Sequence, residues 1–168
     1  MTSDMELCKQ LETRFLGTSC IIKLNFYPRA GQITSFQLWA HHGKGSGKAA
    51  RPIQILEGVS GRWDDIDLFL IGHMTKLATA PIQRTYSEFK RGAPDGRLRH
   101  RRVSLAGTGG WSKAYLEQSR DGQVPRGSYV EKALMDPVSL GAPLIRLWVH
   151  RERKDGQDTL EIRHEVTA

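Results

Sequence analysis

Three histidines stand at predicted strand ends, where side chains are well placed to do chemistry. His41 and His42 follow the strand-like stretch "ITSFQLWA", and His73 comes two residues after the apolar run "DLFLI". Loops at strand ends often carry functional groups on a rigid scaffold, and neutral imidazole is the commonest metal ligand in proteins. The same histidines also fit ordinary surface loops. Spacing alone therefore leaves a metal site and a plain loop both open.

A basic segment, residues 84–102, is the second candidate for function. It carries seven Lys or Arg residues against Glu88 and Asp95, with Tyr86 and Phe89 interleaved. We predict a polar insertion containing glycine and proline, whose cations neutralise phosphates or contact an acidic protein. A solvated basic hairpin at a sheet edge, where charge discourages edge pairing, stays open. The candidate partner-binding residues are Lys90, Arg91, Arg97, Arg99, Arg101 and Arg102.

Other polar patterns indicate less. The aspartates at 64, 65 and 67 fit a cation cluster, but Asp64 and Asp65 fit better at a helix-to-strand turn with their carboxylates in water. The stretch "GKGSGK" departs from a phosphate-binding loop at His42 and Ala49. Cys8 has no Cys-x-x-Cys partner, and neither has the other cysteine, so both are read as small hydrophobes.

Hydrophobic periodicity predicts the elements that position these residues, with strands dominant. Ser3 and Glu6 have the spacing of a capping box for an N-terminal helix over 1–16. Ile53, Leu56, Val59 and Trp63 have helical spacing in a segment beginning near Pro52, although Gly58 and Gly61 weaken that prediction. The other predicted elements are a hairpin of strands 20–26 and 33–40, a buried strand 67–71, strands within 80–87 and 102–111, a short helix 128–135, and paired strands within 142–152 and 158–166.

Composition is that of an ordinary globular chain. The 168 residues are 39% hydrophobic and 26% charged, which fits one domain with a buried core. The excess of 25 Lys and Arg over 18 Asp and Glu gives a net charge of +7, which favours polyanionic partners. Two cysteines and the absence of a signal-peptide pattern predict a cytoplasmic location. No apolar stretch approaches the roughly 20 residues that a membrane helix needs, so we expect no membrane role.

Residues 15–150 resemble the C-terminal half of the calcineurin-like metallophosphoesterases, closest to phage and prophage members. The resemblance is carried by "LGTSCIIKLNF", a strand ending in "HHG", "DLFLIGHMTK", "LAGTGGW" and "SLGAPLIRLWV". It implies a two-layer β-sandwich with flanking helices that holds two metal ions at strand ends. His41, or His42 if the register slips by one, then matches a ligand of the first metal together with His73. Thr75 stands where the second metal's histidine is expected.

The expected fold is therefore an α/β chain of the α+β class, a partial metallophosphoesterase-like β-sandwich, mostly strands with a few short flanking helices. We expect one domain over 1–168, consisting of the N-terminal helix 1–16, the metallophosphoesterase-like half 17–150, and a C-terminal strand and tail 151–168. Upstream of 17 the family's motifs Asp-x-His, Gly-Asp and Gly-Asn-His are missing. With them are missing the aspartate that bridges the metals and the histidine that protonates the leaving group.

These departures predict a non-catalytic remnant that acts by binding. The phage-like resemblance suggests an inhibitor of a host nucleic-acid-handling or defence complex in the host cytoplasm. The expected partner is an acidic protein surface or a nucleoprotein complex rather than free nucleic acid, and a homodimer stays open. No cofactor is expected beyond at most one weakly bound Mn²⁺, Zn²⁺ or Ni²⁺ ion. The alternative is a metal-dependent phosphohydrolase or nuclease completed by a second chain.

Overall fold

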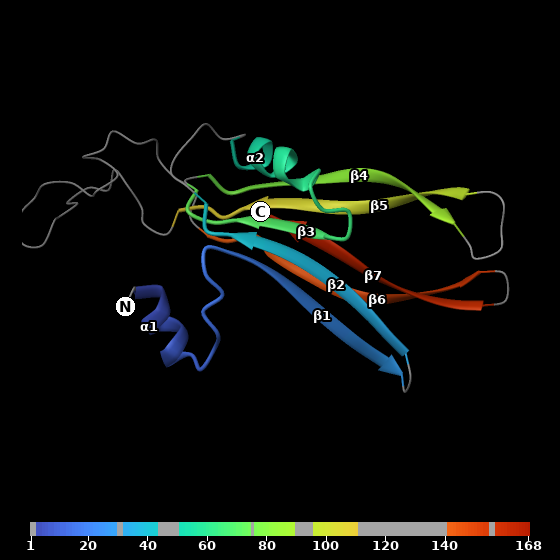
Figure 1. Cartoon of the computed structure of the whole chain (residues 1–168), viewed down its shortest axis with the longest axis horizontal. Helices are drawn as coiled ribbons and strands as arrows, with labels where there is room; N and C mark the ends of the chain where they lie inside the picture. The colour runs from blue at the N-terminus through green and yellow to red at the C-terminus, as the bar shows by residue number, and fades with distance from the viewer. Residues whose placement is uncertain are drawn as a thin grey trace, which may run out of the picture.

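The computed structural model describes residues 3–29, 32–43, 51–74, 76–89, 96–110, 141–154 and 157–168. Strands predominate over two short helices, which confirms the α+β class (Figure 1). In chain order the elements are α1 (Ser3–Gln10), β1 (Ser19–Arg29), β2 (Gln32–His41), α2 (Arg51–Ser60), β3 (Leu68–Ile71), β4 (Ala78–Phe89), β5 (Gly96–Gly107), β6 (Leu144–Lys154) and β7 (Gln157–Thr167).

The strands form two sheets. The larger has the order β1-β2-β3-β5-β4, and β6 pairs with β7 in the smaller one. β2, β3 and β5 run parallel to one another, while β1–β2, β4–β5 and β6–β7 are antiparallel pairs. The predicted pairing of 20–26 with 33–40 and the predicted final pair of strands are both confirmed. Because β2, β3 and β5 are parallel, their carboxyl ends lie at the same edge of the sheet.

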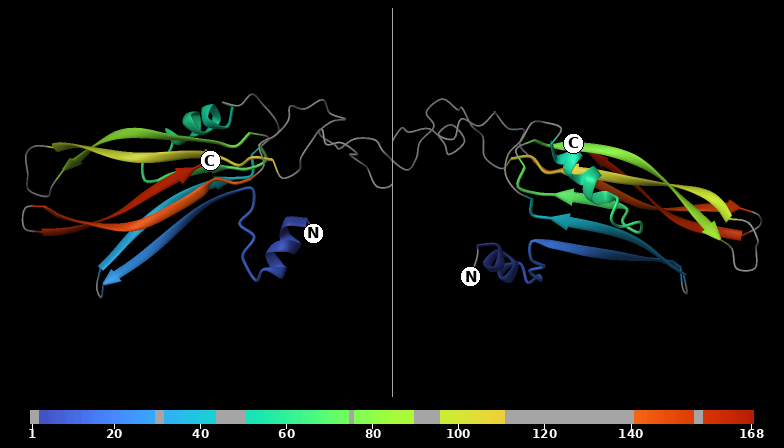
Figure 2. Two further views of the ribbon diagram at one scale, coloured as in Figure 1. Left: turned by 180° about the vertical axis from the view of Figure 1, so that it is seen from behind. Right: turned by 45° about the horizontal axis from the view of Figure 1, so that its top comes forward.

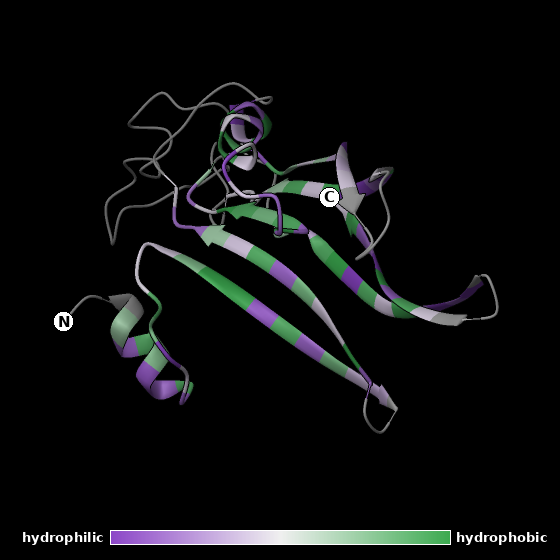
Figure 3. Ribbon diagram, turned by 45° about the vertical axis from the view of Figure 1, so that its right-hand side comes forward, coloured by the Kyte–Doolittle hydropathy of each residue, from purple (hydrophilic) through white to green (hydrophobic). Residues whose placement is uncertain are grey.

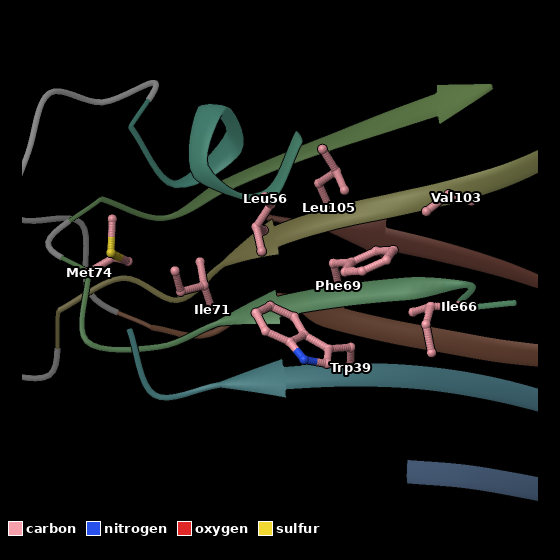
Figure 4. Close-up of a cluster of buried hydrophobic side chains, with 8 residues drawn as sticks. All are labelled: Trp39, Leu56, Ile66, Phe69, Ile71, Met74, Val103 and Leu105. Carbon is pink, nitrogen blue, oxygen red and sulfur yellow. The ribbon is translucent and has the colours of Figure 1, made fainter. Parts of the chain in front are cut away.

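Two hydrophobic cores lie on opposite faces of the larger sheet. α2 packs on one face, and the β6–β7 sheet covers the other (Figure 2). The α2 side contains Trp39, Leu56, Ile66, Phe69, Ile71, Met74, Val103 and Leu105 (Figure 4). Phe36, Leu68 and Ala106 form the centre of the core between the sheets. β3 is buried on both faces, which explains why its sequence "LFLI" is apolar without alternation.

Strands nearer the surface alternate instead. Apolar and polar residues follow one another along β1 and β2 (Figure 3), and in β1 Leu24 and Phe26 pack toward the core between the sheets while Lys23 and Asn25 are exposed. Ile145 and Leu147 of β6 pack inward in the same way, whereas Trp148 is exposed. β6 is therefore buried on one face over residues 144–149.

The short length of β3 divides the larger sheet. β3 pairs with β2 only over Leu38–His41 and with β5 only over Ser104–Gly107. β2 begins at residue 32 and β5 at residue 96, so both strands extend well beyond the start of β3. In that region the β1–β2 and β4–β5 hairpins diverge, and the β6–β7 pair is visible between them (Figure 1).

Three predicted boundaries differ from the structure. α1 ends at Gln10 rather than at residue 16, and Glu12 has a φ of 51°, a left-handed conformation that cannot continue a helix. The predicted insertion is wrong for residues 96–102, because they form the first part of β5 and pair with β4. The glycines and proline near residue 92 favour a loop in the sequence. In the structure, residues 96–102 instead satisfy their backbone hydrogen bonds by pairing with β4, and both strands have twelve residues. The predicted break at residue 150 falls inside β6.

Several predicted features lie outside the described residues. They are Thr75, Lys90, Arg91, the glycine-rich loop from residue 44 and the helix predicted at 128–135. Within the described ranges, neither helix has the length and apolar character needed to cross a bilayer.

Candidate functional site at the ends of the parallel strands

The loops that follow β2, β3 and β5 begin side by side. His41 is in register with Ile71, and Ile71 with Gly107. Just beyond the strands, the Gly72 N–H donates to the His41 carbonyl at 2.8 Å, and the Thr108 N–H donates to the Ile71 carbonyl at 3.0 Å. These main-chain bonds hold the three loop starts at one sheet edge.

His42 and His73 face each other across this edge. Their ring centroids lie 4.9 Å apart, with an angle of 33° between the planes, and both side chains are exposed. The Nδ1 of His42 is 3.2 Å from the Gly43 carbonyl oxygen. Because a carbonyl only accepts, Nδ1 is the donor, and in the neutral ring the Nε2 lone pair is then free to bind a metal.

Two glycines allow this approach. Gly43 has a φ of 83°, and a Cβ placed there would collide with the carbonyl oxygen of Gly72. A Cβ on Gly72 would lie 3.1 Å from the carbonyl oxygen of His42, a tight contact, so the requirement for glycine is strict at Gly43 and weaker at Gly72. His73 itself has a φ of 52°, which is uncommon outside glycine. The motifs "HHG" and "IGH" therefore position the two imidazoles through their glycines.

His41 has a different environment. Its ring stacks on Trp39 with a centroid distance of 5.5 Å, and its Nδ1 accepts the Gly43 N–H at 2.7 Å. Of the two histidines that the sequence left open, the structure brings His42 to His73. His41 instead stabilises the turn that carries His42. Among the described residues no group of three or more His, Cys, Asp or Glu side chains could hold a metal ion.

Arg101 is engaged inside the fold rather than displayed with the other cations. Its guanidinium donates to the Asp67 carboxylate at 2.6 and 3.0 Å and to the carbonyls of Asp64 and Asp65, both at 2.7 Å. Asp67 also accepts the Gln37 N–H at 2.8 Å. The three aspartates thus form no cation cluster. Asp64 and Asp65 are exposed at the turn, as predicted, while Asp67 joins β2, β3 and β5.

The remaining arginines of β5 are divided between its two faces. Val103 and Leu105 point toward α2, whereas Ser104 and Ala106 point toward β6–β7. By this alternation Arg102 and His100, both exposed, lie on the β6–β7 side, and half-exposed Arg99 lies on the α2 side with Arg101. The backbone of Arg97 belongs to β5 near its start. Residues 96–102 of the basic segment are therefore part of a strand, with Arg102 on one face and Arg99 and Arg101 on the other, so these three arginines do not form a single patch.

The contact between His164 and Ser104 was not predicted from the sequence. The Nε2 of His164 lies 2.9 Å from the Ser104 Oγ, and the imidazole ring packs edge-on against Phe36 with a centroid distance of 5.1 Å. Burial between the two sheets lowers the pKa of this imidazole below 6.5; the nearby Arg102 and Arg101 lower it further, and Asp67 opposes them. The two bonded residues are sixty positions apart, and no motif in the sequence links them.

Comparison of the chain with protein-family models, with curated proteins and with solved structures gives no match. The strand ends offer two imidazole side chains, His42 and His73, which are part of a metal site rather than a whole one. Zinc sites in proteins use three or four protein ligands. The exposed Arg102 can bind an anionic partner on the β6–β7 side of the sheet.

Proposed function

We propose that this chain acts by binding an acidic protein surface or a nucleoprotein complex, and that its fold is a partial metallophosphoesterase-like sandwich. The observation that carries the binding role is the position of Arg102 and His100. Both are exposed on the β6–β7 side of β5, in a chain whose net charge is +7. The exposed guanidinium of Arg102 attracts anionic partners and sets their orientation.

The metallophosphoesterase-like fold is supported by where its motifs fall. "HHG" ends β2, "IGH" follows β3, and both lie at the carboxyl edge of parallel strands in a chain with two stacked sheets. Two-metal hydrolysis needs a pair of ions about 4 Å apart that clamp the attacking and leaving oxygens. His42 and His73 supply part of one such site, so the isolated chain binds rather than hydrolyses.

A second candidate function is favoured by the approach of His42 to His73. Two imidazoles with a 4.9 Å centroid separation, one on a left-handed residue, suit a half-site that a second polypeptide completes. In that case the assembled pair is a metal-dependent phosphohydrolase or nuclease. The added chain would bring the carboxylates and the remaining histidines.

The first experiment tests hydrolysis. The purified chain with Mn²⁺ or Ni²⁺ is assayed on an aryl phosphodiester and on single-stranded DNA, and we expect no turnover above background. Calorimetry should show Mn²⁺ or Ni²⁺ binding no tighter than about micromolar, the range expected of two imidazoles without a carboxylate. His42→Ala and His73→Ala should each weaken it further, while His150→Ala at a distant half-exposed site should not. Turnover that disappears in His73→Ala would replace the binding proposal by the catalytic one.

The second experiment tests binding itself. The tagged chain is used to capture partners from host lysate at low salt, and we expect a protein or nucleoprotein complex that high salt releases, because screening weakens exposed charge contacts. Capture of nothing above a charge-matched control protein would contradict the proposed function.

A further inference from the structure

A groove of about 820 Å³ opens where the two hairpins of the larger sheet diverge. One wall contains Thr34 and Ser35 of β2, and the other contains residues 100–102 of β5. Residues 160–165 of β7 form its floor, and Asp67 closes its inner end. We call this space the inter-hairpin groove.

The groove exists because β3 is too short. β3 begins at Leu68, whereas β2 begins at Gln32 and β5 at Gly96. Asp67 bonds to both walls: its carboxylate accepts the Gln37 N–H, its N–H donates to the Gln37 carbonyl, and its carbonyl accepts the Ser104 N–H. Nearer the starts of β2 and β5, residues 32–36 pair only with β1, and residues 96–103 pair only with β4. Each wall therefore presents a backbone edge that has no strand partner within the described part of the chain, and such edges accept an added strand.

We propose that the inter-hairpin groove binds an extended, acidic peptide segment of a partner protein, which takes the place of the missing first half of β3. Strands in a sheet are about 4.7–4.9 Å apart, so one extended segment can pair with the edge of either wall. Main-chain hydrogen bonds then supply affinity, and side-chain contacts supply specificity. This inference rests on the proposed binding function and assigns a place to it.

The charges of the groove favour an acidic occupant. Arg163 pairs with Glu161 at 3.8 Å, Glu165 with Arg146 at 3.4 Å, and Arg101 with Asp67. Arg102 has no ion-pair partner among the residues that the structure describes, and it lines the groove beside His100. The carboxylates of the groove are thus already paired, and a cation is left to bind a carboxylate of the guest.

The floor adds an apolar requirement. Leu160 and Ile162 line it, and Ile162 also packs against the core between the sheets. Successive side chains of an inserted strand alternate between the floor side, which Arg102 also faces, and the opposite side. The expected guest therefore presents both acidic and β-branched apolar residues to the floor side, and its β-branched residues favour the extended conformation.

The probe is a fluorescein-labelled peptide of about ten residues, a typical strand length, that repeats Glu-Glu-Val-Val so that its floor-facing side chains include both Glu and Val. Its lysine counterpart, with Lys in place of each Glu, serves as the charge control. Fluorescence anisotropy should show binding of the Glu peptide at least about tenfold tighter than of the Lys peptide. Hydrogen exchange should slow at main-chain amides of 32–36 or 96–103 when the Glu peptide binds, because strand addition pairs them.

Arg102→Glu should weaken binding of the Glu peptide by at least about tenfold. Lys23→Glu makes the same charge change at an exposed position of β1 outside the groove and should leave the affinity unchanged. Circular dichroism melting checks that both variants fold. Unchanged affinity in Arg102→Glu, or binding without slowed exchange at either edge, would overturn the proposal.

A single-stranded DNA oligonucleotide provides the remaining comparison. If it displaces the Glu peptide and loses affinity in Arg102→Glu, the groove is a nucleic-acid site and the peptide assignment is wrong. Capture from host lysate distinguishes a failure of the groove proposal from a failure of the proposed binding function. A partner still retained by the Arg102→Glu chain would leave the binding function standing and remove the groove from it.

Discussion

At the scale of single residues, partners rather than identity decide what an arginine does. Arg101 and Arg102 are neighbours in the sequence, and both belong to the same basic run. The first donates to one carboxylate and two carbonyls of the turn before β3, while the second is exposed beside the groove. Neighbouring residues of a strand point to opposite faces, so a charge run in a strand always divides in this way.

Arg101→Met should lower the free energy of unfolding by about 2 kcal/mol, because it leaves the Asp67 carboxylate and two turn carbonyls without their donor. Arg102→Met should change it by no more than about 0.5 kcal/mol, as is usual for exposed side chains. Urea unfolding of both variants measures the difference. Equal effects would show that the Arg101 network does not stabilise the turn.

At the scale of elements, the sequence predicted those whose pattern is local. The β1–β2 hairpin, α2 and β3 each show their own periodicity or apolar run, and all three are present. The C-terminal end of α1 and the start of β5 were missed because they depend on other features. A left-handed Glu12 ends α1, and pairing with β4 extends β5 through a segment rich in turn residues.

The candidate site was predictable in part. The family resemblance implied that a histidine after β2 and His73 after β3 meet at strand ends, and the parallel pairing of the two strands brings these ends to one edge. Which of His41 and His42 meets His73 could not be predicted, because it depends on the φ of Gly43 and on the stacking of His41 on Trp39. The inter-hairpin groove could not be predicted either, because it results from the unequal lengths of β2, β3 and β5.

Replacing Gly58 tests how much a glycine inside α2 lowers the free energy of unfolding. Gly58 lies in α2, is exposed, and a Cβ there would meet nothing within 4 Å. Gly58→Ala should raise the free energy of unfolding by about 0.5–1 kcal/mol, because alanine loses less backbone freedom on folding. Gly43→Ala is the matched opposite, since its positive φ and its collision with Gly72 make it destabilising. Thermal melting of the two variants should show shifts of opposite sign.

At the scale of the whole molecule, three layers are held by two cores of different character. The buried polar side chain of α2, Ser60, donates to the Glu57 carbonyl of its own helix, whereas in the core between the sheets Ser104 and His164 contact each other across the two sheets. Within the part of the chain that the structure describes, the β6–β7 sheet has two strands, and an isolated two-stranded sheet is marginally stable in water. Its attachment therefore depends on packing against the larger sheet, with His164 at the contact.

This attachment should weaken in acid. Burial lowers the pKa of His164 below 6.5 in the folded chain, with Arg102 and Arg101 acting in the same direction and Asp67 against them. Above pH 6.5 the imidazole is neutral in both states. Below it the unfolded chain binds a proton that the folded chain does not, so stability falls as the pH decreases toward the folded pKa. The loss for one proton is at most about 1.4 kcal/mol per pH unit.

Urea unfolding between about pH 7.5 and about pH 5.5 tests this, because that range spans the ordinary histidine pKa. His164→Gln keeps a neutral hydrogen-bonding side chain beside Ser104 but cannot take up the proton, so its unfolding midpoint should fall less over the range than that of the unmodified chain. His150→Gln, at a half-exposed position on β6, should retain the full fall. The comparison is made within each variant, so any constant cost of the substitution cancels. Equal acid sensitivity in all three chains would place the titrating group elsewhere and leave the Ser104–His164 contact as packing alone.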